Sequence, residues 1–198
     1  MTLEGKNIGF AMTGSFCTFS TVFQALPLLL ETGANIIPIL SPNAQTISTR
    51  FGTAEENIEK LESLCGKKSI KTIAEAEPIG PKKLLDALII APCTGNTLAK
   101  IAGGITDTSV TMAAKSTIRN SRPVILAVST NDGLGGSAKN IGLLLNMKNI
   151  YFAPFGQDDP VKKKNSLVAD MQRLAETTEL ALDGIQIQPL LLGPPDIK

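Results

Sequence analysis

The residues best suited to chemistry are small polar side chains that follow an apolar run, Ala87–Ala91. The run is β-prone and suits a strand buried on both faces, and it stops at Pro92. Four polar residues come next: Cys93, Thr94, Asn96 and Thr97. Hydroxyls, an amide and unpaired backbone N–H groups at the carboxyl end of a parallel strand are placed to bind a ligand. The alternative is a plain strand-to-helix turn whose polar residues only cap the helix.

Two other predicted strands end in the same way. Asn7–Met12 runs into Thr13, Gly14 and Ser15, and Asn35–Leu40 is followed directly by Ser41. A Gly-Ser turn before a helix offers N–H groups, a hydroxyl and the positive end of a helix dipole, which together can hold a phosphate. The chain has neither GxGxxG nor the GK[ST] ending of a P-loop, so no dinucleotide or nucleoside-triphosphate motif is present. For Ser15 and Ser41 the alternative is an ordinary helix cap.

A polar, glycine-rich loop follows the predicted strand Val124–Ser129 and is a candidate second wall for the pocket. It begins Thr130-Asn131-Asp132 and continues through three glycines. Asp132 is the candidate acid or base, and a flexible surface loop is the alternative.

The composition excludes several kinds of chemistry. The chain has no histidine, so any proton transfer must use another side chain, water or a partner protein. Its three cysteines, Cys17, Cys65 and Cys93, are far apart and form no CxxC, which predicts neither disulfides nor a zinc site. We therefore expect no metal and a reducing, cytoplasmic location.

Charge and hydropathy argue against nucleic acid and membrane as partners. The net charge is +1 and aromatic residues make up 4% of the chain, so there is neither a basic stripe nor a stacking platform. The start of the chain lacks a signal-peptide pattern, and no apolar run reaches the roughly 20 residues that cross a bilayer.

Strands alternating with helices predict a doubly wound, Rossmann-like or flavodoxin-like α/β fold, a parallel sheet with helices on both faces. The 198 residues fit one domain, with 185–198 as an apolar, proline-rich tail that packs on its own domain or on a neighbouring protomer. Pro38 suggests an edge strand or a bulge. The pattern also predicts a short strand over Ser69–Ile73 and a last helix that includes Leu167, Met171, Leu174 and Leu180.

The segment APCTGNTLAKIAGGITD, with the turn Thr13-Gly14-Ser15 and with Ser41, resembles a known group of flavoproteins. The segment is close to the A-P-x-[TS]-x-N-T-x-A-K-x-A-x-G-I-x-D signature of the superfamily that includes peptidyl-cysteine decarboxylases, phosphopantothenoylcysteine decarboxylase and flavin prenyltransferases. The likeness runs to about Ala181. It implies FMN as cofactor, with the Gly14-Ser15 turn and Ser41 at its phosphate. The residues along the ribityl chain and ring would be Ala91, Pro92, Thr94, Asn96 and Thr97.

Two further segments, LEGKNIGFAMTGSFCTF and VSTNDGLGGSAKNIGLLLN, resemble a sporulation branch of this superfamily. That resemblance implies a partner chain that is similar to NAD(P)-dependent dehydrogenases, and oxidation of a dihydropyridine dicarboxylate in the mother cell. Lys100, Lys115 or Arg119 would supply cations for such a substrate, or form only a solvated helix face. By analogy with the superfamily we expect a homo-oligomer, a trimer or a multiple of one.

The chain departs from the decarboxylases of the superfamily in two ways. Their pocket histidine is missing, so we do not expect cysteine decarboxylation. Their P-x-M-N segment is replaced by Ser129-Thr130-Asn131-Asp132, in which Asn131 would take over the binding role. A non-catalytic protein that keeps the flavoprotein fold and assembles the partner is the alternative function.

Overall fold

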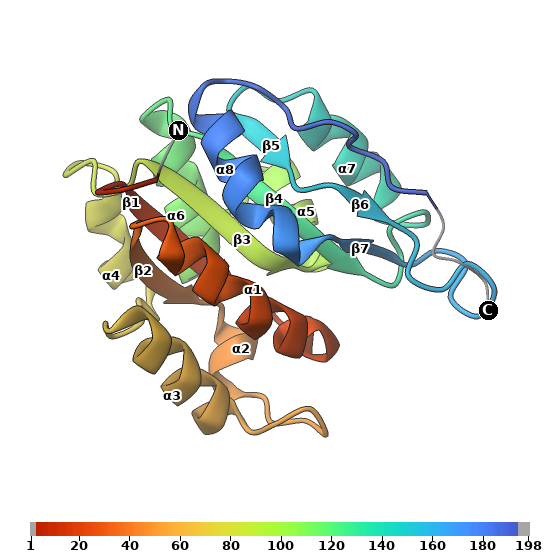
Figure 1. Ribbon diagram of the computed structural model, residues 1–198, viewed down its shortest axis with the longest axis horizontal. Coiled ribbons are helices and arrows are strands. Elements are labelled where there is room, and N and C mark those ends of the chain that lie inside the picture. Colours follow the sequence, from red (N-terminus) through yellow and green to blue (C-terminus); the bar gives the residue numbers. More distant parts are fainter. Residues whose placement is uncertain (1–2, 194–198) are drawn as a thin grey trace.

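The computed structural model describes residues 3–193 and places a mixed, seven-stranded sheet at the centre of the molecule (Figure 1). Neighbouring strands follow the order β2-β1-β3-β4-β7-β6, and β5 also pairs with β4. The parallel strands are β1 (Asn7–Met12), β2 (Asn35–Leu40), β3 (Ala87–Cys93), β4 (Val124–Thr130) and β5 (Ile150–Phe152). The antiparallel strands are β6 (Phe155–Gly156) and β7 (Leu167–Ala169).

The middle of the sheet forms the core because its strands are apolar on both faces. All seven residues of β3 are buried, and so are six of the seven in β4. β2 lies at one end of the strand order, which confirms the edge position suggested by Pro38. Ile70 extends this edge, since its N–H donates to the Pro38 carbonyl and its carbonyl accepts from the Leu40 N–H, both at 2.9 Å.

Helices cover both faces of the sheet (Figure 1). In the view shown, α1 and α8 lie in front of the sheet and α5 and α6 behind it. The helices are α1 (Phe19–Glu31), α2 (Pro42–Thr46), α3 (Ala54–Cys65), α4 (Ile73–Ala76), α5 (Gly95–Ala102), α6 (Ser109–Arg119), α7 (Ala138–Leu145) and α8 (Leu174–Leu182). Three 3-10 helices span Phe16–Thr18, Glu77–Ile79 and Met171–Arg173. The α/β fold is therefore as predicted, except that a wholly parallel sheet is wrong.

The strand predicted over Ser69–Ile73 is wrong. Only Ile70 makes a β-bridge, and α4 already begins at Ile73. Thr72 and Glu75 form a capping box in which each side chain accepts a hydrogen bond from the other residue's N–H. This local signal starts a helix and stops the strand.

The last helix is shorter than predicted. Leu167–Ala169 forms β7, which pairs antiparallel with Ser129 and Thr130 at the end of β4, and α8 begins only at Leu174. Leu167 and Ala169 are buried on either side of a half-buried Val168, so their spacing has the period of a strand. The side chain of Asp170 then accepts from the Gln172 N–H and ends the extended segment.

The described part of the tail packs along β6. The N–H of Phe155 donates to the Leu190 carbonyl at 3.0 Å, and the N–H of Leu192 donates to the Phe155 carbonyl at 2.9 Å. Ile187 is buried, whereas Leu191 is 69% exposed. Residues 194–198 of the predicted tail lie outside the described residues. Within residues 3–193, no helix is long and apolar enough to span a bilayer.

Candidate functional site

The carboxyl ends of β1, β2 and β3 surround a polar pocket of about 130 Å³. Five of the residues predicted to bind a cofactor line it: Gly14, Ser41, Thr94, Asn96 and Thr97. They come from three separate strand ends, which the parallel sheet brings to one edge. The sequence prediction did not include the other five lining residues at this cofactor pocket: Thr13, Pro42, Asn43, Lys100 and Thr108.

The side chain of Thr13 links the turn after β1 to the end of β3 and the turn that follows it through two hydrogen bonds. Its hydroxyl donates to the Pro92 carbonyl at 2.6 Å and accepts from the Thr94 N–H at 3.0 Å. The residue is 1% exposed, so both hydrogen bonds are shielded from water. One side chain thus fixes the distance between two walls of the pocket. A threonine directly after a strand was the signal in the sequence that could have identified it.

Two pocket residues are also helix caps. The Thr94 hydroxyl accepts from the Thr97 N–H at 3.3 Å at the start of α5, and the Ser41 hydroxyl accepts from the Ala44 N–H at 3.3 Å at the start of α2. The capping interpretation is therefore correct for both. Capping holds these hydroxyls at the pocket wall, so it does not compete with a binding role.

Ser15 belongs to a neighbouring hydroxyl cluster formed by Ser15, Thr18 and Ser129. The oxygen atoms of Ser15 and Ser129 are 2.8 Å apart, and those of Thr18 and Ser129 are 2.6 Å apart. The cluster joins the turn after β1 to the end of β4, beside Gly14 of the polar pocket. Ser15 itself does not line that pocket. Hydroxyls donate to phosphate oxygens as readily as to each other, so the cluster can extend an anion site.

The predicted ring-binding residues Ala91 and Pro92 are buried in β3. Their side chains do not reach the polar pocket, and Pro92 contributes a carbonyl that Thr13 already occupies. Asn131 is exposed at the start of the glycine-rich loop, and its Oδ1 accepts from the Ser166 hydroxyl at 3.5 Å. None of these three residues lines the polar pocket, but the Pro92 carbonyl contacts Thr13, which does.

Asp132 holds the loop that follows β4 in place through two hydrogen bonds. Its carboxylate accepts from the hydroxyls of Thr130 and Ser137, the latter at 2.9 Å. The Thr130 hydroxyl, more than any other contact, holds the pKa of Asp132 below its ordinary value. A carboxylate with a lowered pKa is a weak base. A catalytic role for Asp132 stays a prediction.

The same loop packs against the first residue of α5. A Cβ built on Gly95 would lie 2.5 Å from Ser137 Oγ, 2.8 Å from Thr130 Oγ1 and 2.9 Å from Asp132 Oδ1. Only glycine leaves room for this contact. Gly95 thus sets how closely the loop after β4 approaches the start of α5.

Lys100 lines the polar pocket and is paired with Asp107. Its Nζ contacts both carboxylate oxygens of Asp107, at 2.9 and 2.7 Å, and its side chain is 22% exposed.

Cys93 is fully buried, and burial raises the pKa of its thiol, so it is not a nucleophile. Across residues 3–193, no group of three or more His, Cys, Asp or Glu residues is placed to hold a metal ion.

The chemistry of these donors suits an anion with several oxygen atoms. Hydroxyl groups, the amides of Asn43 and Asn96, a lysine and the start of α5 surround a small pocket, and a phosphate takes donors of these kinds. The phosphate group and the adjoining polar chain of a ligand such as FMN therefore fit the residues present.

Comparison with known proteins extends this picture. Residues 1–174 match the protein family described as Flavoprotein. The chain is also 50% identical over 191 residues to the B subunit of dipicolinate synthase from Bacillus subtilis (strain 168), covering 96% of each protein.

Solved structures show the same relationship in three dimensions. A crystal structure of the dipicolinate synthase B subunit from Bacillus halodurans matches with a TM-score of 0.89 and 46% identity, over 98% of this chain and 100% of that chain. The FMN-dependent cysteine decarboxylase SpaF matches with a TM-score of 0.66 at 18% identity, over 92% of this chain and 98% of that chain. The second match shows a shared fold alone.

Proposed function

Because the chain belongs to the Flavoprotein family, we propose that it binds FMN and acts as the B subunit of a dipicolinate synthase. The observation that carries the FMN proposal is the convergence of Gly14, Ser41 and the Thr94–Thr97 turn on one polar pocket. The proposal for the reaction rests on the 50% identity to a protein of that name.

The residues fit the cofactor in a definite way. The Gly14–Ser15 turn and Ser41 would hold the phosphate, with the hydroxyl cluster beside them. Thr94, Asn96 and Thr97 would line the path of the ribityl chain. Lys100 also lines this pocket, and its ammonium group is paired with the carboxylate of Asp107.

The proposed reaction is the oxidation of dihydrodipicolinate, or its hydrated precursor, to dipicolinate. Dihydrodipicolinate loses a hydride and a proton, and the aromatic ring that forms makes the step favourable. When bound, FMN supplies a hydride acceptor; NAD(P), held by the dehydrogenase-like A subunit, is the other candidate acceptor. With no histidine in the chain, the proton passes to water, to a carboxylate such as Asp132 or to the partner.

The proposed partner, location and oligomeric state follow from the similarity to the B subunit of dipicolinate synthase. The chain would work with the A subunit of dipicolinate synthase in the cytoplasm of the mother cell of a spore-forming bacterium. It would assemble as a homo-oligomer, a trimer or a multiple of one.

A titration with FMN tests the cofactor proposal. The purified chain should shift the flavin absorbance and quench its fluorescence in a saturable manner. Ser15→Ala and Asn96→Ala should each weaken binding about fivefold to fiftyfold, the loss of one or two hydrogen bonds to a charged or polar ligand group. Ser63→Ala, a change in α3 on another part of the molecule, should leave the affinity unchanged. Absence of any flavin binding would overturn the proposal.

The alternative is a non-catalytic protein that assembles the A subunit. The missing histidine and the lowered pKa of Asp132 favour it, since neither provides a base. The dehydrogenase-like partner should be assayed alone, with this chain, and with its Asn96→Ala variant. Loss of activity with Asn96→Ala while the two proteins stay associated would exclude a purely structural role. Full activity with Asn96→Ala would support it.

A further inference from the structure

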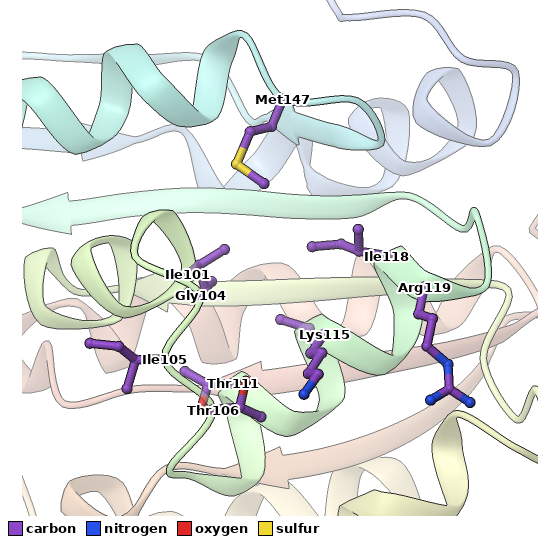
Figure 2. Close-up of a pocket in the computed structure, with 10 residues that line it drawn as sticks. Ile101, Gly104, Ile105, Thr106, Thr111, Lys115, Ile118, Arg119 and Met147 are labelled. Atoms are coloured by element: carbon purple, nitrogen blue, oxygen red, sulfur yellow. The ribbon is translucent and has the colours of Figure 1, made fainter.

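A second cavity, of about 320 Å³, lies beside α6 and is lined mainly by apolar side chains (Figure 2). We call it the apolar groove and define it by Ile101, Ile105, Ala114, Ile118 and Met147. Ile101 lies one helical turn after Thr97 in α5, so the groove lies farther along that helix than the polar pocket, and the two cavities share no lining residue. The proposed FMN site does not use it.

The groove exposes apolar surface to solvent. Ile105 is 51% exposed and Met147 is 37% exposed, although both side chains are large and apolar. Figure 2 shows Met147 on one side of the groove and Ile105 and Ile118 on the other. A concave apolar surface of this kind favours a ligand with a flat or aliphatic body.

Two cations border the groove on α6. Lys115 and Arg119 are one helical turn apart, and in Figure 2 their charged ends both point to the side away from Met147. Within the described part of the chain, no carboxylate lies within 4.0 Å of either one. Glu77 shares with them an adjoining cavity of about 180 Å³ without forming an ion pair. Like charges at this spacing repel each other, and an anionic ligand would relieve the repulsion.

We propose that the apolar groove binds a planar aromatic dicarboxylate, with its ring on Ile105, Ile118 and Met147 and its carboxylates at Lys115 and Arg119. The charge of the ligand matches two cations on successive turns, and no acidic residue lines the groove. Side chains at this spacing have Cβ atoms about 5–6 Å apart, a span that suits two carboxylates on one edge of a ring. That the natural ligand is pyridine-2,6-dicarboxylate or its dihydro form rests on the proposed function.

Methyl NMR of the isolated chain tests this directly. Pyridine-2,6-dicarboxylate, added in buffer with excess EDTA to prevent metal chelation, should shift the methyl signals of Ile105, Ile118 and Met147 in a saturable manner. Benzene-1,3-dicarboxylate, which has the same carboxylate spacing and no ring nitrogen, should do the same. Benzoate, with one carboxylate, should bind at least fivefold more weakly.

Variants that change charge distinguish specific binding at Lys115 and Arg119 from non-specific attraction of anions to the protein. Lys115→Gln and Arg119→Gln should each weaken binding about fivefold or more, and Ile105→Glu should weaken it more than tenfold by repelling the dianion. Lys6→Gln, which removes an exposed charge before β1, should keep the affinity within twofold. All of these positions are exposed, so the variants should fold, and circular dichroism checks that they do.

Two results would overturn the proposal: no shift of the groove methyls at millimolar dicarboxylate, or shifts that persist in the Lys115→Gln and Arg119→Gln double variant. The measurement requires neither FMN nor the dehydrogenase-like partner. If the chain binds the dicarboxylate but not FMN, the proposal for the groove holds and the proposal for the cofactor fails. If it binds FMN but not the dicarboxylate, only the proposal for the groove fails.

Discussion

At the scale of single residues, the pocket depends on hydroxyl groups that have two roles each. Thr94 and Ser41 cap helices and line the polar pocket, and Thr13 joins two strand ends. The types of residue at strand ends were sufficient to predict five of the pocket residues. They did not predict Thr13, because its role depends on a carbonyl and an N–H about 80 residues away along the chain.

Replacing Thr13 with valine should destabilise the protein. The change leaves the Pro92 carbonyl and the Thr94 N–H without their partner, and Thr13 itself is only 1% exposed, so water does not replace the lost hydroxyl. Each unsatisfied buried group costs about 1–3 kcal/mol, so we expect the free energy of unfolding to fall by about 2–4 kcal/mol in urea denaturation. Thr13→Ser keeps the hydroxyl and should lose less than half of that. An unchanged free energy of unfolding in Thr13→Val, which keeps the methyl group, would show that the two hydrogen bonds do not contribute to stability.

Glu62 should make the stability of the protein depend on acid pH. Burial raises the pKa of this carboxyl, but hydrogen bonds from Lys68, the Ser69 N–H and Lys71 outweigh burial and lower the pKa to about 2. A carboxyl with a lowered pKa stabilises the fold fully above its ordinary value of 4.5, and this contribution is lost as the pH falls toward 2.

Glu62→Gln should therefore lower the free energy of unfolding at pH 7 by about 1–3 kcal/mol. The variant should also reduce the slope of stability against pH below 4.5. Glu59→Gln, at an exposed position of the same helix, is the control and should change little. An unchanged pH profile in Glu62→Gln would contradict the role of these hydrogen bonds.

At the scale of elements, the start of α5 is where the loop after β4 is fixed. The contact at Gly95 and the strand pairing at Ser129 and Thr130 place this loop next to the pocket. Helical periodicity in the sequence predicted the last helix, of which the structure confirms the part that forms α8. It missed β7, since a three-residue strand has too few positions to show a period and forms only by pairing with β4.

Two glycines in helices should respond in opposite ways to alanine. Gly95→Ala brings a Cβ within 2.5–2.9 Å of Ser137, Thr130 and Asp132, so it should displace the loop, weaken FMN binding at least fivefold and lower stability. Gly142→Ala in α7 meets nothing within 4 Å and should stabilise the protein by about 0.5–1 kcal/mol. Thermal unfolding and flavin titration measure both. Stabilisation by Gly95→Ala would show that the loop adapts freely.

At the scale of the whole molecule, the sheet collects three strand ends into one polar pocket and leaves a separate apolar groove along α6. The order of strands and helices predicted the α/β architecture, because buried parallel strands and amphipathic helices leave clear patterns. The groove was not predictable, since it forms only where the fold places Met147 against the segment Ile101–Arg119, which is distant from it in sequence. Lys115 and Arg119 were recognised as cations, but only the fold places them beside an apolar surface.

The central claim is that FMN binds with its phosphate at the ends of β1 and β2. A crystal structure of the chain soaked with FMN tests it most directly. We expect density for the phosphate between the Gly14–Ser15 turn and Ser41, with the ribityl chain along Thr94–Thr97. Density for FMN at another place, or none at saturating FMN, would contradict the claim.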